Sequence, residues 1–311
     1  MASCCQTAKK VELIEETFHS DFMKIGVGLP ATIPSSSRKL IVPWAIKAEK
    51  LNFSTLGIID RIVYPNHEPL ITLAAAAGAT QNIRLMTTIL LAPTRETVLL
   101  AKQVATLDRI SGGRFTLGLG VGNRRDDSEA TGSNFTTRGK RFEYQLKLLK
   151  QIWSGERLNQ NVGAIGPEPT RVGGPEILLG GSDPRAIARV AKLADGFMSG
   201  SKEPESAAII FKQIESMWKS NNRQGNPRLV GSLYFALGDR AQELGQSYLK
   251  SYYGQDPRFA EKVAKSLKSD RESILQRIRE FEKIAADEVI IWPCIADPKQ
   301  LDLLSEAISS R

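Results

Sequence analysis

Short apolar runs alternate with amphipathic runs along the chain from residue 23 onward. Residues 83–91 are an almost unbroken series of apolar residues and threonine, as expected of a strand buried on both faces. Residues 138–153 instead place Phe142, Leu146 and Trp153 on one face of a helix. The whole pattern predicts strands at 24–29, 55–60, 83–91, 114–121, 176–179, 196–199, 228–237 and 288–293. Helices are predicted at 43–51, 69–79, 95–110, 138–153, 184–195, 205–220 and 298–308, with a helical insert over about 241–286.

Strands that alternate with helices in this way predict an α/β fold, a (β/α)8 TIM barrel with a helical insert after strand 7. The alternative is a doubly wound sheet. It is disfavoured because the glycines at 118–122 lack the spacing of a dinucleotide-binding loop, and because residues 123–127 have the character of a polar loop rather than a helix start. We expect one barrel domain over 23–311, preceded by a disordered extension at 1–22.

Glycines alternate along the fourth predicted strand, at Gly118, Gly120 and Gly122. Glycine costs a strand conformational entropy and packing, so this pattern indicates that something large lies against the backbone there. At the end of a barrel strand, this glycine pattern predicts that the space beside the backbone is left open for a ligand.

Charge and cysteine usage exclude several classes of function. The net charge is +8, but basic and acidic residues are mixed along the chain, so we expect no nucleic-acid partner. No apolar run is long enough to span a bilayer, so we expect no membrane association. Cys4, Cys5 and Cys294 lack the spacing of metal ligands and fit a reduced, cytoplasmic setting without a bound metal.

The active site of a TIM barrel is built from the loops that follow its strands. In this chain those positions are Gly28–Pro30, Asp60–Arg61, Thr88–Ile89, Gly120–Arg125, Gly180–Asp183, Ser199–Ser201 and Trp292–Pro293. They contain few nucleophiles or bases, and His67 is the one histidine near a strand end. A bound cofactor would then supply the reactivity. Gly180, Gly181 and Ser182 precede a capped helix and form either a phosphate-binding turn, to which Arg185 adds charge, or an ordinary tight turn.

Several segments occur in the order of a known superfamily. They are Thr106–Gly122, Arg84–Arg95, Arg138–Phe142, Ile152–Gly155, Gly180–Ser182, Ala194–Gly196 and Asp287–Pro293. Over about 23–308 the chain resembles the luciferase-like flavin monooxygenase superfamily of FMN- or deazaflavin-dependent oxidoreductases. The resemblance implies a barrel that binds FMN, or the deazaflavin coenzyme F420, at the carboxyl ends of the strands.

The resemblance also implies roles for individual residues. It places a non-prolyl cis peptide at Thr88–Ile89, under the flavin ring. The expected cofactor-binding residues are Asp60, Thr88, Ile89, Gly120, Gly122, Asn123, Gly180, Gly181, Ser182 and Arg185.

Two departures from bacterial luciferase bear on the chemistry. Val121 stands where luciferase has a basic phosphate ligand, and Asp60 with Arg61 stands where it has a catalytic histidine. Arg61 either faces the flavin and stabilises an anion there, or forms a salt bridge with Asp60 or another neighbour. His67 is either an acid–base group over the ring or a surface loop residue. Arg61 and His67 are therefore the candidate catalytic residues.

The leading expectation is a monooxygenase that uses reduced FMN and O2 on a small organic substrate, with a separate flavin reductase as partner. The alternative is an F420-dependent reductase or dehydrogenase that transfers hydride. A third possibility is a flavin-binding barrel without catalytic activity. The helices at 69–79 and 95–110 have small and apolar faces, and we expect them to pair in a homodimer.

Overall fold

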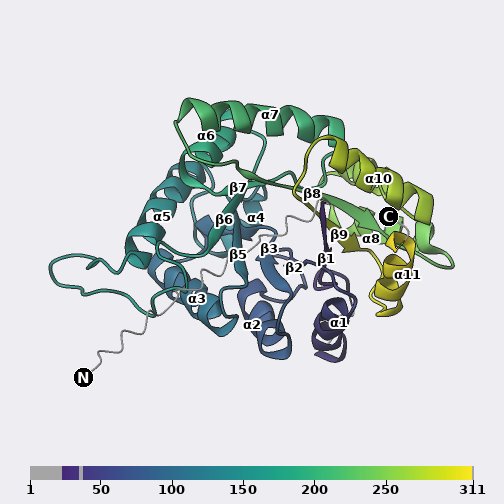
Figure 1. Cartoon of the computed structure of the whole chain (residues 1–311), viewed down its shortest axis with the longest axis horizontal. Helices are drawn as coiled ribbons and strands as arrows, with labels where there is room; N and C mark the ends of the chain where they lie inside the picture. Colours follow the sequence, from purple (N-terminus) through teal and green to yellow (C-terminus); the bar gives the residue numbers. More distant parts are fainter. Residues whose placement is uncertain (1–22, 35–37, 310–311) are drawn as a thin grey trace, which may run out of the picture.

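The structure of the protein is a computed structural model that describes residues 23–34 and 38–309. Its centre is a ring of parallel strands surrounded by helices (Figure 1). The strands are β1 (Lys24–Gly28), β2 (Thr55–Ile58), β3 (Arg84–Thr87), β4 (Leu90–Leu91), β5 (Phe115–Gly120), β6 (Glu176–Gly180), β7 (Gly196–Met198), β8 (Arg228–Phe235) and β9 (Glu288–Pro293). The expected extension at 1–22, with Cys4 and Cys5, lies outside the described residues.

The strands form one closed sheet. Their order is β3-β2-β1-β9-β8-β7-β6-β5-β4, and β3 also pairs with β5, which closes the ring. β3 and β4 are two parts of one barrel strand, because both pair in parallel with β5 and only residues 88–89 separate them. The ring therefore consists of eight barrel strands, and the TIM barrel predicted from the alternation of elements is confirmed.

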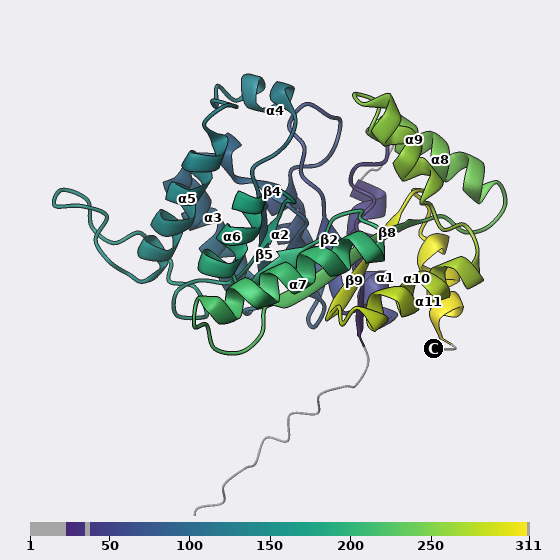
Figure 2. The same cartoon turned by 90° about the horizontal axis from the view of Figure 1, so that it is seen from above.

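Most helices cover the outside of the barrel. They are α1 (Arg38–Lys50), α2 (Pro69–Ala79), α3 (Thr97–Ile110), α5 (Arg138–Trp153), α6 (Pro184–Leu193), α7 (Pro204–Ser220), α10 (Arg271–Lys283) and α11 (Lys299–Ile308). Three others lie at one end of the barrel in Figure 2: α8 (Ala241–Tyr252) and α9 (Pro257–Lys265) pack against each other, and α4 (Arg125–Ala130) lies apart from them. A short 3-10 turn, η1 (Ala92–Thr94), follows β4.

Two boundaries differ from the prediction. The expected polar loop after β5 contains the helix α4, so that expectation was wrong; Asp126 and Asp127 in the first turn favour the helix through its dipole. The first helix begins at Arg38 rather than at Pro43, which lies inside it. The chain between β8 and β9 forms α8, α9 and α10.

The two ends of the barrel differ in chemistry. At the amino ends of the strands, Arg228 forms ion pairs with Glu176 and Glu288, the first residues of β6 and β9. The two carboxylates raise the pKa of the Arg228 guanidinium despite its burial. Charged clusters at this end of a TIM barrel stabilise the fold, whereas the carboxyl ends of the strands carry function.

Candidate functional site

A cavity of about 610 Å3 opens at the carboxyl ends of the strands. Its volume falls within the range of about 300–1,000 Å3 that small-molecule sites occupy. The lining residues that concern the site are Ile59, Thr88, Ile89, Asn123, Gly180, Gly181, Ser182, Met198, Ser199, Gly200, Ser201, Lys202, Ser206, Ser232, Tyr234, Tyr253, Lys262, Ser266 and Trp292. Strand ends supply one part of the wall, and α9 with the end of α8 supplies another.

Six of the expected cofactor-binding residues meet in this cavity. They are Thr88, Ile89, Asn123, Gly180, Gly181 and Ser182. The Thr88–Ile89 peptide is cis, as the resemblance implied. Thr88 is held in place by its hydroxyl, which donates to the carbonyl of Ile58 at 2.8 Å.

The glycines of β5 are explained by this same segment. A Cβ built on Gly118 would lie 1.9 Å from the carbonyl oxygen of Thr87, and one built on Gly120 would lie 1.8 Å from Cδ1 of Ile89. The bare face of β5 is therefore filled by the protein's own neighbouring strand. The expectation that these glycines leave room for the ligand itself was wrong at Gly118 and Gly120. They act indirectly: Gly118 makes room for the backbone of Thr87, and Gly120 makes room for the side chain of Ile89, which lines the cavity.

The turn after β6 has the features of an anion-binding turn. Gly181 has a φ of +132°, and a Cβ there would lie 2.9 Å from the Cβ of Ala186. Gly180 and Ser182 lie on either side of it in the cavity wall. α6 begins two residues later with Asp183 as its N-cap and Pro184 in its first turn, so its positive end lies beside the turn.

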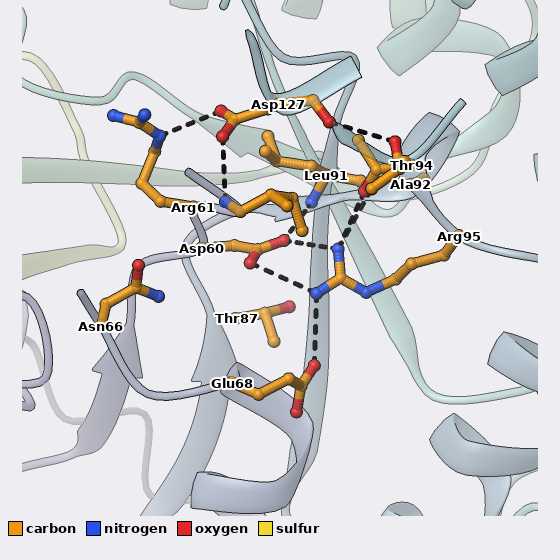
Figure 3. Close-up of polar contacts among 12 residues, drawn as sticks. Asp60, Arg61, Asn66, Glu68, Thr87, Leu91, Ala92, Thr94, Arg95 and Asp127 are labelled. Carbon is orange, nitrogen blue, oxygen red and sulfur yellow. Dashed lines mark hydrogen bonds and ion pairs between the residues drawn. The ribbon is translucent and has the colours of Figure 1, made fainter. Parts of the chain in front are cut away.

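Asp60 does not line the cavity. Figure 3 shows its carboxylate facing Arg95, with an N–O distance of 2.6 Å, and accepting a hydrogen bond from the amide of Leu91 at 2.8 Å. Arg95 also pairs with Glu68 at 3.2 Å. Burial raises the pKa of Asp60, and the positive charge of Arg95 opposes this rise. These contacts hold β4 in position, and the side chain of Asp60 does not reach into the cavity.

Arg61 forms its salt bridge with Asp127 of α4. Its Nε donates to Asp127 at 3.0 Å, and both side chains are buried, with 8% and 3% exposed (Figure 3). The same carboxylate accepts the amides of Ile62 and Val63 at 3.0 and 2.7 Å. Of the two expectations for Arg61, the structure shows the ion pair, and the partner is Asp127 rather than Asp60. Its guanidinium lies 6.0 Å from the ring of Tyr252.

The other expected residues lie outside the cavity. His67 is a partly exposed residue of the loop before α2. Gly122, at φ +74°, has the side chain of Leu91 beside it. Arg185 pairs with Asp183 at 3.0 Å and its side chain is 88% exposed. It lines a second cavity of about 600 Å3 between α5 and α6.

The sequence prediction missed a polar part of the cavity wall that includes Lys202, Tyr253 and Lys262. Lys202 follows the predicted loop position Ser199–Ser201, so that loop alone could have indicated it. Tyr253 directly follows α8 and Lys262 lies on α9, where the amphipathic pattern of the sequence gave no sign of a site. Among the described residues, no group of three or more His, Cys, Asp or Glu side chains is placed to hold a metal ion. In the same part of the chain no helix has the length and apolarity to cross a bilayer.

Two tyrosines of the cavity lining are hydrogen-bonded to each other. The hydroxyls of Tyr234 and Tyr253 are 2.7 Å apart, and both residues line the cavity. Burial raises the pKa of each phenol above its usual value of 10.0, so both are protonated at neutral pH. In such a pair one hydroxyl donates to the other, which leaves one proton to donate elsewhere.

The sequence model of the luciferase-like monooxygenase family matches residues 23–288. The chain belongs to this family. Its members among the matched proteins include oxidoreductases of more than one type, so membership alone does not select a reaction.

Three relatives illustrate the range. The chain is 25% identical over 195 residues to the 5,10-methylenetetrahydromethanopterin reductase of Methanolobus tindarius, which covers 61% of this chain and 59% of the relative. It is 24% identical over 193 residues to the FMNH2-dependent dimethylsulfone monooxygenase of Pseudomonas putida, which covers 59% and 52%. An uncharacterized protein of Mycobacterium bovis is 25% identical over 170 residues, 52% of this chain and 60% of that one. The chain thus spans about three fifths or less of these curated relatives.

Solved structures share the fold over a longer stretch. The monooxygenase RslO1 from Streptomyces bottropensis matches with a TM-score of 0.78 at 18% identity, over 93% of this chain and 99% of that one. An F420-dependent secondary alcohol dehydrogenase, solved with an F420–acetone adduct, matches with the same TM-score at 15% identity and the same coverage. At these identities the likeness shows the fold alone.

Proposed function

We propose that this protein is an oxidoreductase that binds coenzyme F420 in the 610 Å3 cavity and transfers hydride between it and a small organic substrate. The observation that carries the proposal is the meeting of Thr88, Ile89 and the Gly180–Ser182 turn in one cavity of sufficient size. The apolar side chains of Ile89, Met198 and Trp292 suit a planar ring, and the turn beside the start of α6 suits a phosphate.

Two features favour the deazaflavin over FMN. Part of the cavity wall is polar, with Ser199, Ser201 and Ser232 among its residues, whereas an oxygen-activating flavin site benefits from a dry, water-excluding pocket. The second cavity is basic and suits the acidic tail of F420. Its charged residues are Arg138, Lys140, Glu143, Asp183, Arg185, Arg189 and Lys192, five cations against two anions. The bound coenzyme would supply the hydride donor or acceptor.

The chain's own residues then bind and orient the reactants. Gly181 and Ser182 hold the phosphate through backbone amides, and Ile89 supports the ring. The phenols of Tyr234 and Tyr253 are both protonated, and the one proton not used between them is available to an oxygen of the substrate. Arg61 is held by Asp127, so its role is to position the loop after β2 rather than to exchange a proton.

An FMN-dependent monooxygenase is the second candidate, supported by the names of two matched proteins. In that case a separate reductase would supply reduced FMN as a partner.

Coenzyme binding separates the candidates. We expect F420 to bind anaerobically at least tenfold more tightly than reduced FMN, measured by isothermal titration calorimetry. Substituting Arg189→Ala, in the basic second cavity, should weaken F420 and leave FMN unchanged, since FMN lacks the acidic tail. Tighter binding of reduced FMN, with substrate-dependent O2 uptake, would establish the second candidate instead. Tight binding of either coenzyme without turnover would indicate a non-catalytic barrel.

A further inference from the structure

We propose that Lys202 and Lys262 form a binding site for a phosphate-type dianion carried by the substrate, so that the substrate is a small phosphorylated molecule. This inference rests on the proposed function, because it assigns the polar side of the same cavity to the second reactant. Lys202 follows β7, Lys262 lies on α9, and both line the cavity. Two ammonium groups match the two negative charges of a phosphate monoester.

Neither lysine has a partner that explains its position. In the part of the chain that the structure describes, neither ammonium forms an ion pair or a hydrogen bond with another side chain. Lys250 and Lys265, which belong to the same pair of helices, both pair with Glu261. Lys202 is partly buried and Lys262 is exposed, and their charges repel each other, so an anion bound between them would relieve this repulsion.

The surroundings add neutral donors and no free acid. Ser201 and Ser206 line the same cavity as the two lysines, and so does Ser266, whose hydroxyl already donates to the carbonyl of Val263 at 2.8 Å. The acid in this wall, Glu203, is already paired with Arg277 at 2.5 Å. Hydroxyl donors beside two neighbouring ammonium groups are a usual setting for phosphate oxygens.

The electrostatics agree with this assignment. Burial lowers the pKa of the Lys202 ammonium, and the charge of Lys262 lowers it further. A bound dianion would reverse both effects, because it would compensate the buried charge and lie between the two cations.

The cofactor's phosphate has its own place. The Gly180–Ser182 turn leads into α6, whereas Lys262 is carried by α9, and Figure 2 shows these two helices on opposite sides of the barrel mouth. One cavity thus contains this turn, Lys202 from the loop after the neighbouring strand β7, and Lys262 from α9 across the mouth. This arrangement accommodates two phosphate groups from two molecules.

Titration with inorganic phosphate tests the site. The wild type, Lys202→Ala, Lys262→Ala and the control Lys265→Ala are each saturated with F420 and titrated by calorimetry at constant ionic strength. Lys265 lies on the same helix as Lys262, is exposed, and does not line the cavity. We expect each cavity variant to weaken phosphate binding at least tenfold and the control to change it less than twofold. Lys202→Arg should retain most of the affinity, since it keeps the charge.

Coenzyme affinity, measured on the same variants, identifies the source of the phosphate. If the lysines serve the substrate, the dissociation constant of F420 stays within twofold of the wild type. A tenfold loss of F420 affinity in Lys202→Ala would overturn the proposal, because the lysines would then hold the coenzyme. Equal phosphate affinity in all variants would also overturn it. If the wild type binds no coenzyme, the proposed function fails, and the phosphate titration of the free protein still decides whether the lysines form an anion site.

Discussion

Substituting the glycines of β5 tests how this strand makes room for its neighbour. In Gly118→Ala the new methyl would lie 1.9 Å from the backbone carbonyl of Thr87, which is fixed in the barrel wall. The Thr87 hydroxyl also donates to the carbonyl of Gly118 at 2.8 Å, so β3 and β5 cannot separate without loss of this bond. Overpacking of a core costs about 1–3 kcal/mol, and a backbone obstacle places this variant at or above about 3 kcal/mol.

Gly120→Ala should be milder, because its methyl would meet the terminal Cδ1 of Ile89, which can rotate away. We expect a loss of about 1 kcal/mol. Combining it with Ile89→Ala removes the obstacle, so the two changes should cost less together than their sum. Gly120→Ala should also weaken coenzyme binding, since Ile89 lines the cavity.

The assay is urea-induced unfolding followed by circular dichroism and tryptophan fluorescence. The matched control is Gly78→Ala in α2, where no atom lies within 4 Å of the new methyl. This substitution should raise the free energy of unfolding by about 0.5–1 kcal/mol. The same chemical change is therefore expected to have opposite signs at two positions. A Gly118→Ala protein within about 0.5 kcal/mol of the wild type would refute the explanation of the β5 glycines.

Three further predictions concern other contacts. Asp127→Ala leaves the buried Arg61 unpaired and should lower the free energy of unfolding by about 3 kcal/mol, with a smaller loss for Asp127→Asn, as measured in urea. Tyr253→Phe removes the 2.7 Å bond to Tyr234; we expect a stability loss of about 1–2 kcal/mol and slower turnover at unchanged F420 affinity, and unchanged turnover would remove the phenol pair from the reaction. Asp270→Ala removes the N-cap of α10 and should cost about 1 kcal/mol at neutral pH. Because the folded protein lowers the pKa of Asp270 below 3.8, this contribution is present above that pH and is lost as the pH falls below it, so thermal melts of the two proteins should converge in acid.

Much of the fold was predictable because its signals are local. The buried strand at 83–91 and the amphipathic helix at 138–153 could be assigned from the spacing of apolar residues alone. Both occur close to the predicted positions. The cis peptide at Thr88–Ile89, which separates β3 from β4, was implied by the family resemblance and not by the residue pattern. The helix α4 was missed because the polar sequence at 123–130 has no apolar period, and Asp127 of this helix holds Arg61.

Only those parts of the candidate site that are formed by recognisable sequence motifs were predicted. The Gly180–Ser182 turn and the Thr88–Ile89 segment each form a short, recognisable string, and the structure brings them into one cavity. Asp60 and Arg61 also follow a strand, yet their side chains turn to Arg95 and Asp127. Sequence position gave their place at the strand end but could not give the direction of their side chains, which depends on partners from distant elements.

The sequence by itself determined that this chain is an α/β barrel with its site at the carboxyl ends of the strands, because alternation, capping and turn residues act over a few positions. The tertiary structure decided what fills each space. It showed that Gly118 and Gly120 make room for Thr87 and Ile89 of the protein itself. It also brought Lys202 and Lys262, far apart in the chain, to one wall. Contacts between segments that are distant in the chain leave no repeating pattern of residues in the sequence. Only the closed barrel therefore reveals which side chains share a cavity.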